Sequence, residues 1–190
     1  MGYSFQYTLT PEEYALYNVY TVWSAPDKRQ YRIQSFISIF FLGAMGAISA
    51  IYMMGSISSR DMYSSFSWIV VGVLSLVVAV IFNLSVGPRT KKNAVRLVQL
   101  DENKYIISES MIELTDQNLH HKDDNSETYQ SYHSIARVSE ANDCIYIYVN
   151  TVQAYIIPKR IFKSKEEEDD VLKFLTQKIS VTSSLRSISS

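Results

Sequence analysis

The sequence predicts an α+β membrane protein, in which a hairpin of two transmembrane helices is joined to a small antiparallel β domain closed by a C-terminal helix. Three observations predict it. Two long uncharged stretches lie in the first half of the chain, short alternating segments follow from Tyr105 onward, and a capped acidic helix start comes after them. A chain of 190 residues has room for one such domain beside an anchor.

The anchor is predicted from charge-free runs. No charged residue occurs from Ile33 to Ser59, and none from Met62 to Pro88. Because about 20 apolar residues cross the hydrocarbon core of a bilayer, we expect transmembrane helices over 33–54 and 66–87, with residues 55–65 as an external loop. The alternative is a pair of buried helices in a soluble protein, but such helices seldom run this long without a charge.

Flanking charges orient the hairpin. Arg60, balanced by Asp61, is the only basic residue of the connecting loop, whereas both outer flanks are basic. The flanking basic residues are Lys28, Arg29 and Arg32 before the first span, and Arg89, Lys91, Lys92 and Arg96 after the second. The positive-inside rule therefore places both termini in the cytoplasm of a multi-pass cell-membrane protein.

Small residues four positions apart suggest how the spans pack. The pairs are Gly43 with Ala47, Gly46 with Ala50, and Ser75 with Ala79. Such pairs let helices approach closely in lipid, either within the hairpin or in a homodimer, and the sequence leaves both open. Asn83 is expected to bond a neighbouring helix. The absence of charge inside the spans argues against a proton-coupled transporter or an ion pump.

The cytoplasmic segment before the first span, residues 1–32, predicts a short strand over Tyr3–Thr10 and then a helix. Thr10, Pro11 and Glu13 form a capping-box start for that helix. The helix could lie on the membrane surface or pack on the soluble domain. Packing is favoured because its only charges are acidic, whereas surface helices usually carry Lys and Arg.

Three regions follow the second span. We expect a basic juxtamembrane helix over residues 88–103 and a β domain over residues 104–180. Residues 181–190 are Ser-rich and are expected to form a disordered tail. Alternating segments separated by turn signals predict seven strands. These are Tyr105–Ser108, Met111–Thr115, Asn118–Lys122, Glu127–Tyr132, Ile135–Ala141, Ile145–Asn150 and Val152–Pro158. A helix follows from a capping box at Ser164, with Val171, Leu172, Leu175 and Ile179 as its apolar face.

Seven strands closed by a helix are the plan of a pleckstrin-homology-like (PH-like) module. A more specific pattern consists of Tyr132-x-x-Ile135-x-x-Val138, Ile145–Tyr148, Ala154–Arg160 with Phe162, and the acidic helix. On these residues, the segment between Tyr132 and Leu175 resembles the YcxB-like family of bacterial membrane proteins, which have two spans and a small C-terminal domain. The family more often has Trp at the place of Tyr132. The resemblance implies this architecture and a bacterial setting, but no reaction.

Little in the sequence points to catalysis. His120 and His121 would face opposite sides of a strand and could not easily share a metal, whereas His121 and Asp123 could share a face, with His133 nearby. Cys144 has no His placed to activate it and reads as a core residue. No glycine lies beyond Gly87, so no phosphate loop is present. We therefore expect a non-enzyme without cofactor or metal.

Basic residues remain as a candidate contact with anionic lipid or a partner: Lys91, Lys92, Arg96, Lys159 and Arg160. For Lys159 and Arg160 the alternative is a structural turn between strand and helix. The net charge of -1 gives no sign of nucleic-acid binding. Two functions remain: a membrane-anchored binding or scaffold module with a protein or lipid partner, and an immunity protein against a bacteriocin or membrane-active toxin.

Overall fold

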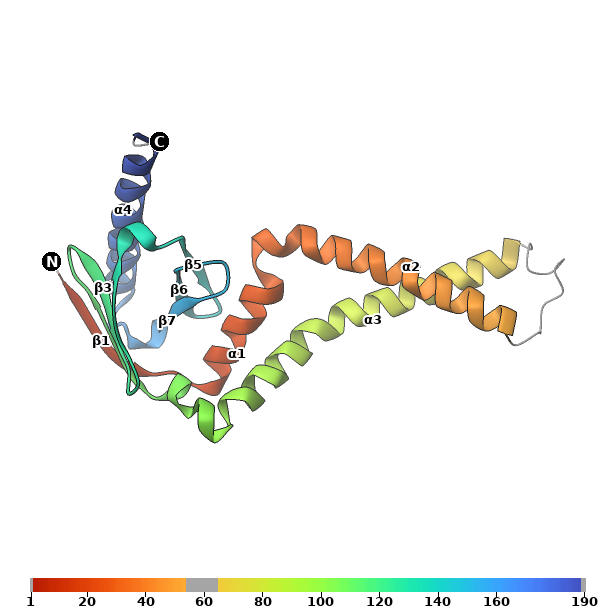
Figure 1. The fold of residues 1–190 in the computed structure, drawn as a ribbon, viewed down its shortest axis with the longest axis horizontal. Helices are drawn as coiled ribbons and strands as arrows, with labels where there is room; N and C mark the ends of the chain where they lie inside the picture. The colour runs from red at the N-terminus through yellow and green to blue at the C-terminus, as the bar shows by residue number, and fades with distance from the viewer. Residues whose placement is uncertain (1, 54–64, 189–190) are drawn as a thin grey trace. The chain divides into compact units, whose positions relative to one another are not determined.

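A computed structural model of the chain describes residues 2–53 and 65–188. The chain divides into two compact units, one formed by Met1–Thr21 together with Lys91–Ser190, and the other by Val22–Thr90. The strands belong to the first unit and the paired long helices to the second (Figure 1). The first unit is therefore discontinuous in sequence, because the second is inserted into it.

Among the described residues, seven strands form a four-stranded sheet in the order β1-β2-β3-β4 and a three-stranded sheet in the order β5-β6-β7, both antiparallel. Their bounds are β1 Tyr3–Thr8, β2 Glu109–Leu114, β3 Asn118–Lys122, β4 Glu127–Ser131, β5 Arg137–Ala141, β6 Cys144–Tyr148 and β7 Ala154–Pro158. The strand predicted over Tyr105–Ser108 is wrong, since most of this segment lies in a 3-10 helix, Asp101–Ile107.

The N-terminal strand takes the place of that missing strand. β1 pairs with β2 from Tyr3 opposite Leu114 to Thr8 opposite Glu109. Phe5 and Tyr7 alternate with exposed residues and are buried in the main core. The strand was predicted, but its partner was not, because nothing in the local pattern identifies a partner that lies beyond two long helices.

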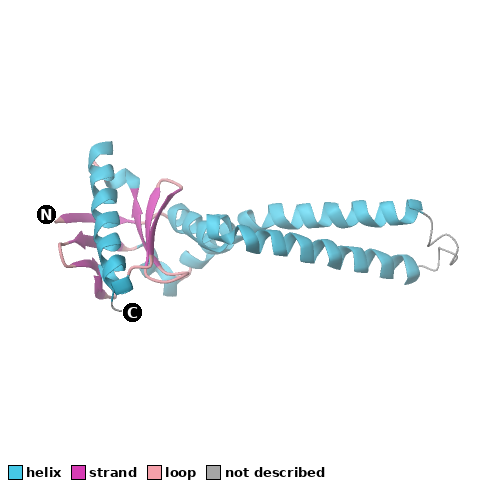
Figure 2. Ribbon diagram, turned by 90° about the horizontal axis from the view of Figure 1, so that it is seen from above, coloured by secondary structure: helices cyan, strands magenta, loops and turns pink. Residues whose placement is uncertain are grey.

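Helix α4 (Lys165–Ile188) closes the domain. Ser164 Oγ accepts a hydrogen bond from Glu167 N at 3.3 Å, as predicted, while Glu167 Oε2 accepts from Lys163 N at 2.7 Å. The helix lies beside the strands (Figure 2). Val171 and Leu175 are fully buried in a core shared with strands of both sheets, and Leu172 is only partly buried. The helix continues to Ile188, where the sequence predicts a disordered tail.

Strand β6 is buried on both faces. Ile145 and Ile147 point into the main core with Leu175, whereas Cys144, Tyr146 and Tyr148 belong to a second apolar cluster on the opposite face. The turn before β6 is tight, since Asn142 and Asp143 adopt the positive φ angles 52° and 58°.

The second cluster is covered by α1 (Pro11–Val19). Its capping box is present: Glu13 N donates to Thr10 Oγ1 at 3.1 Å, and Thr10 N donates to Glu13 Oε2 at 2.8 Å. The ring of Tyr17 lies 5.5 Å from that of Tyr146. Packing on the β domain, the favoured alternative for this helix, is thereby confirmed.

The second unit contains α2 (Arg29–Met53) and most of α3 (Ser65–Val98). Both helices are long and apolar enough to cross a membrane by length and composition. The expected external loop, residues 55–65, lies outside the described residues except for its last one. Helix α3 runs through Pro88 without a break, so the predicted juxtamembrane segment is its continuation and ends at Val98.

Small residues place the two helices in contact. A Cβ atom on Gly43 of α2 would lie 3.4 Å from Ser75 Cα of α3, whereas one on Gly46 would meet nothing within 4 Å. Ser75 and Ala79 are buried on α3. Asn83 differs from expectation, because its amide donates to Ala79 O of its own helix at 3.0 Å.

Candidate functional site

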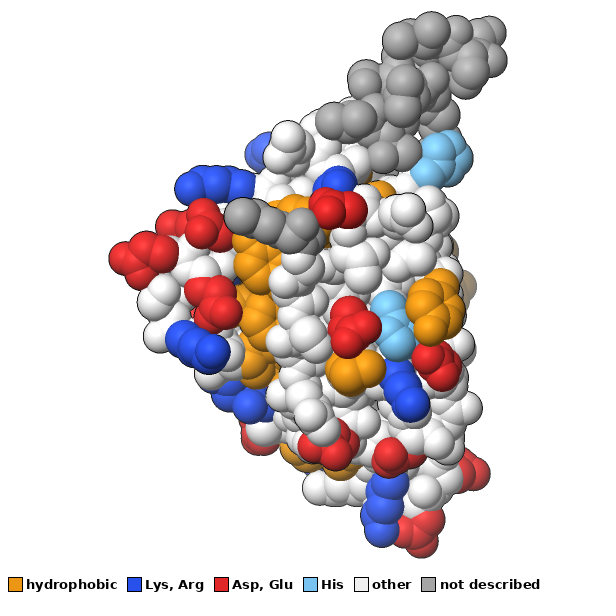
Figure 3. Space-filling view, turned by 90° about the vertical axis from the view of Figure 1, so that its left-hand side faces the viewer, with side chains coloured by type: hydrophobic (Ala, Val, Ile, Leu, Met, Phe, Trp, Pro, Cys, Tyr) orange, Lys and Arg blue, Asp and Glu red, His pale blue; other side chains and the backbone are white. Residues whose placement is uncertain are grey.

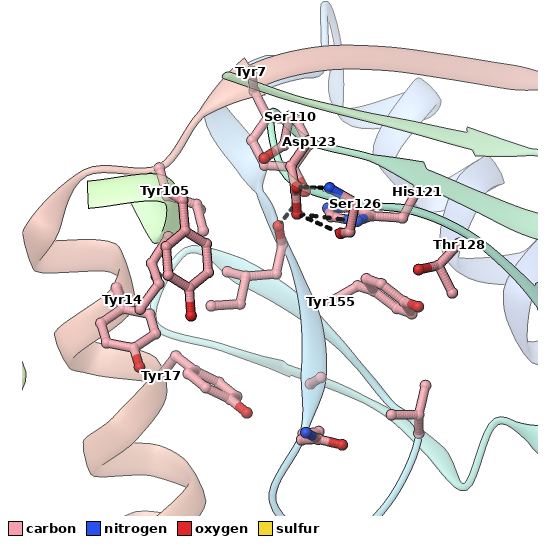
Figure 4. A pocket seen from close by; sticks show the side chains of 16 residues that line it. Tyr7, Tyr14, Tyr17, Tyr105, Ser110, His121, Asp123, Ser126, Thr128 and Tyr155 are labelled. Carbon is pink, nitrogen blue, oxygen red and sulfur yellow. Dashed lines mark hydrogen bonds and ion pairs between the residues drawn. The ribbon is translucent and has the colours of Figure 1, made fainter. Parts of the chain in front are cut away.

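A pocket of about 470 Å³ opens between the two sheets of the β domain. It collects side chains from the end of β1, from α1, from the 3-10 helix Asp101–Ile107, from the β3–β4 hairpin and from the β6–β7 hairpin. The aromatic and polar residues labelled in Figure 4 are Tyr7, Tyr14, Tyr17, Tyr105, Ser110, His121, Asp123, Ser126, Thr128 and Tyr155.

Five tyrosines are among the residues that line the pocket. Tyr7 is buried, and its hydroxyl donates to Ile156 O at 2.6 Å. Tyr17 donates to Val152 O, and its ring lies 6.1 Å from that of Tyr14. Burial raises the pKa of Tyr17 to about 12, so this phenol is neutral at physiological pH.

Asp123 is the acidic group of the pocket. Its Oδ1 accepts from Asn125 N at 2.8 Å and from Ser126 N at 2.7 Å, and its Oδ2 accepts from the Ser126 hydroxyl at 3.1 Å (Figure 4). Partial burial opposes ionisation, but these hydrogen bonds outweigh it and hold the pKa of Asp123 below its usual value. The carboxylate is therefore charged at neutral pH.

His121 shares this face of β3, as the sequence predicts. Its Nδ1 lies 4.0 Å from Asp123 Oδ2, and its ring centroid lies 5.0 Å from that of Tyr155. Burial lowers the pKa of His121 despite the nearby Asp123 carboxylate, so the imidazole is neutral at pH 7. His133 lies apart from the pocket lining, in the 3-10 helix Tyr132–Ser134.

The pocket as a whole was missed from the sequence. Its tyrosines were assigned to separate local features, and Tyr105 to a strand. They come together only because β1 and α1, which precede α2, fold back onto the domain formed after α3. The recurrence of tyrosine in all of these segments was the available signal.

The structure separates the basic residues of the predicted contact into two groups. Lys159 Nζ pairs with Glu140 and, at 3.0 Å, with Glu168 Oε1. Arg160 Nε donates to Glu13 Oε1 at 2.7 Å, and its Nη2 donates to Glu13 Oε2 at 3.0 Å. Lys159–Ile161 is a 3-10 turn between β7 and α4, which is the structural alternative for these two residues.

Lys91, Lys92 and Arg96 differ from that pair. All three side chains are exposed near the end of α3. Within residues 2–53 and 65–188, none of them makes an ion pair. By contrast, Lys159 and Arg160 are held in ion pairs within the first unit.

The remaining candidates for chemistry are Cys144 and the metal-ligating residue types. Cys144 is fully buried, and burial raises the pKa of its thiol to about 11, which confirms its assignment as a core residue. Over the part of the chain that the structure describes, no group of three or more His, Cys, Asp or Glu side chains could hold a metal ion.

The fold thus defines an α+β protein with two antiparallel sheets, a closing helix, a tyrosine-rich pocket and two candidate membrane spans. Residues 114–175, from the last residue of β2 into α4, match the model of the YcxB-like protein family. This match confirms the resemblance that the sequence predicts. No curated protein and no solved structure matches the chain.

Proposed function

We propose that this protein is a membrane-anchored binding module. In this proposal α2 and α3 cross the cell membrane as a hairpin and hold a PH-like domain on the cytoplasmic side, where the tyrosine-rich pocket binds a ligand. The domain acts by binding rather than by catalysis.

One observation supports the proposed two-span membrane anchor. β1 lies before α2 and pairs along its whole length with β2, which lies after α3. Paired strands must be on the same side of a membrane, so the segment between them must cross it an even number of times. A hairpin of two spans satisfies this requirement. A signal sequence or a single anchor would leave the two strands apart.

The charges of the flanks support the orientation. Lys28, Arg29 and Arg32 precede or begin the first apolar stretch, and Arg89, Lys91 and Lys92 follow the second. Segments this basic remain on the cytoplasmic side. The β domain, which is continuous with both flanks, would then be cytoplasmic.

The strand plan supports the PH-like assignment. A four-stranded and a three-stranded antiparallel sheet enclose one core, and the C-terminal helix α4 closes it. In this chain the connection between the first two strands contains α1 and both long helices. The membrane hairpin would then be an insertion into a binding domain.

The lipid part of the proposal is confined to Lys91, Lys92 and Arg96. Exposed cations beside a span attract anionic lipid with about 1 kcal/mol each. In vesicles at low salt, the full chain should therefore associate preferentially with anionic lipid. Changing these three residues to Gln should remove that preference. Changing Lys159 and Arg160 instead should lower domain stability and leave the lipid preference intact.

Site-directed labelling tests the topology. In a Cys144→Ala background, we would place a cysteine at Ser58 or at Ser131 and treat intact cells with a membrane-impermeant maleimide. Ser58→Cys should react in intact cells, and Ser131→Cys only after lysis. Labelling of Ser131→Cys in intact cells, or recovery of the chain in the soluble fraction, would overturn the proposal.

The immunity function remains a second prediction from the sequence. If the chain has this function, cells treated with the toxin should survive only when they contain the chain. A challenge assay with and without the gene tests this directly.

A further inference from the structure

We infer that the tyrosine-rich pocket binds a small organic cation, with an ammonium group held between tyrosine faces and the carboxylate of Asp123. This inference rests on the proposed function, because it names the ligand class of the same pocket.

The charge of the pocket selects a cation. The residues that line it include Asp123 but no Lys and no Arg. The lining also contains His121, which is uncharged at pH 7 because burial lowers its pKa. The lining therefore carries one net negative charge, and an anionic ligand such as a phosphate would meet no opposite charge there.

The walls favour an ammonium with alkyl substituents over a metal ion. Tyr14, Tyr17, Tyr105 and Tyr155 line the pocket from three different elements, as seen in Figure 4. The faces of aromatic rings attract cations, and several rings around one site are how proteins recognise quaternary ammonium groups. A metal ion would instead need several oxygen or nitrogen ligands, which Asp123 and His121 do not supply.

The hydrogen bonds of the tyrosines preserve this arrangement. Tyr7 and Tyr17 donate their hydroxyls to Ile156 O and Val152 O of the β6–β7 hairpin region, which fixes two of the rings. Asp123 is fixed by the turn of its own hairpin. Tyr7, Tyr17 and Asp123 are therefore held in place before a ligand arrives, which reduces the entropy lost on binding.

The size fits a small molecule. A volume of about 470 Å³ lies within the range of ligand pockets, roughly 300–1,000 Å³. A phosphocholine lipid headgroup has the same ammonium but places a phosphate next to it. Since no basic residue lines the pocket to receive that phosphate, a free cation is the better fit.

Calorimetric titration of the full chain in detergent micelles tests the inference, with choline chloride as the probe. Choline should bind. Its uncharged analogue, in which carbon replaces the nitrogen, should bind at least about tenfold more weakly. Equal affinity for the two compounds, or no binding of choline, would overturn the inference.

Two variants connect binding to the pocket. Asp123→Asn keeps an oxygen for the backbone hydrogen bonds of the turn but removes the charge, and Tyr155→Leu removes one aromatic face. Each should weaken choline binding by about tenfold. Tyr129→Leu is the matched control, because Tyr129 is exposed on the outer face of the four-stranded sheet and lies outside the pocket lining. A loss in the control as large as in the variants would contradict the assignment.

Glycerophosphocholine separates the two sources of the ammonium group. It should bind more weakly than choline, and tighter binding would overturn the free cation in favour of a lipid headgroup. Failure of the choline inference is distinguishable from failure of the proposed function. The maleimide labelling of Ser58→Cys and Ser131→Cys tests the topology and does not depend on choline.

Discussion

The imidazole of His120 lies flat on the ring of Tyr129, with 4.3 Å between the ring centroids and 6° between the planes. The two residues are directly opposite each other on β3 and β4. His120 also bridges two carboxylates, since Nδ1 lies 3.1 Å from Glu113 Oε2 and Nε2 lies 2.9 Å from Glu127 Oε1. This outer face otherwise carries scattered charges of both signs (Figure 3).

The bridge makes domain stability depend on pH. The hydrogen bond to Glu113, followed by the contacts with Glu127, raises the pKa of His120 despite some desolvation. A raised pKa in the folded state contributes stability that is complete below the ordinary value of about 6.5 and is lost as pH rises through the folded value. His120→Gln should therefore cost more stability at pH 6 than at pH 8.5, as measured by denaturant unfolding of the full chain in detergent.

His121 provides the matched comparison for this pH effect. Burial lowers its pKa, so protonation opposes folding, and His121→Gln should gain stability relative to the wild type as pH falls below about 6.5. Adjacent histidines should thus give opposite pH trends. The same trend for both variants would contradict the assignment of His120 and His121 to opposite faces.

Leu175 is predicted to be the main contact of α4. It is fully buried in the core, so Leu175→Ala should lower the free energy of unfolding by about 2–5 kcal/mol. Leu172→Ala on the same helix should cost clearly less, because Leu172 is only partly buried. Urea unfolding followed by near-UV circular dichroism measures both, and equal losses would reject this packing of the helix.

The pair of Glu13 with Arg160 joins the capping box of α1 to the turn before α4. The Arg160 guanidinium overcomes partial burial and, with Thr10, holds the pKa of Glu13 below its usual value. A double-mutant cycle with Glu13→Gln and Arg160→Gln should give a coupling energy of about 0.5–1 kcal/mol, since the pair is partly exposed. The exposed pair Asp170 and Lys173, at 3.7 Å, should give almost none.

Gly43 and Gly46 should respond differently to the same substitution. Gly43→Leu introduces atoms where Ser75 already lies and should destabilise the helix pair by about 1–3 kcal/mol. Gly46→Leu should be nearly neutral within one chain, because a side chain there meets nothing within 4 Å. Thermal unfolding in detergent compares the two. A large loss for Gly46→Leu alone would instead indicate that Gly46 faces a second copy of the chain.

Local patterns predict most of the elements of this fold. The capping box at Thr10, the turn at Asn142 and Asp143, and the buried positions Ile147 and Leu175 are all set by neighbouring residues. The 3-10 helix at Tyr105 escaped prediction because its consecutive apolar residues, Tyr105 to Ile107, are equally suited to a strand. The helix predicted over residues 88–103 is present as the continuation of α3 through Pro88, and it ends at Val98.

Long-range pairing explains what could not be predicted. The partner of β1, the ion pair of Arg160 with Glu13 and the pocket all join the N-terminal segment to residues beyond 100. No local pattern specifies such contacts, because they depend on how the chain returns after α3. The sequence groups five basic residues as one candidate contact, but only the fold separates the exposed Lys91 from Arg160, which pairs with Glu13.

The pairing of Tyr3 with Leu114 has a consequence for synthesis of the protein. β1 leaves the ribosome before β2, so Phe5 and Tyr7 stay uncovered until β2 has been translated. Closing a loop of this length in solution costs entropy that grows by about 0.6 kcal/mol with each doubling. If the translocon inserts α2 and α3 during that interval, the two spans bring the chain back to the side of the membrane on which β1 lies. Insertion would then be a step in folding the domain, and a chain that fails to insert would expose the unpaired edge of β2 to proteases.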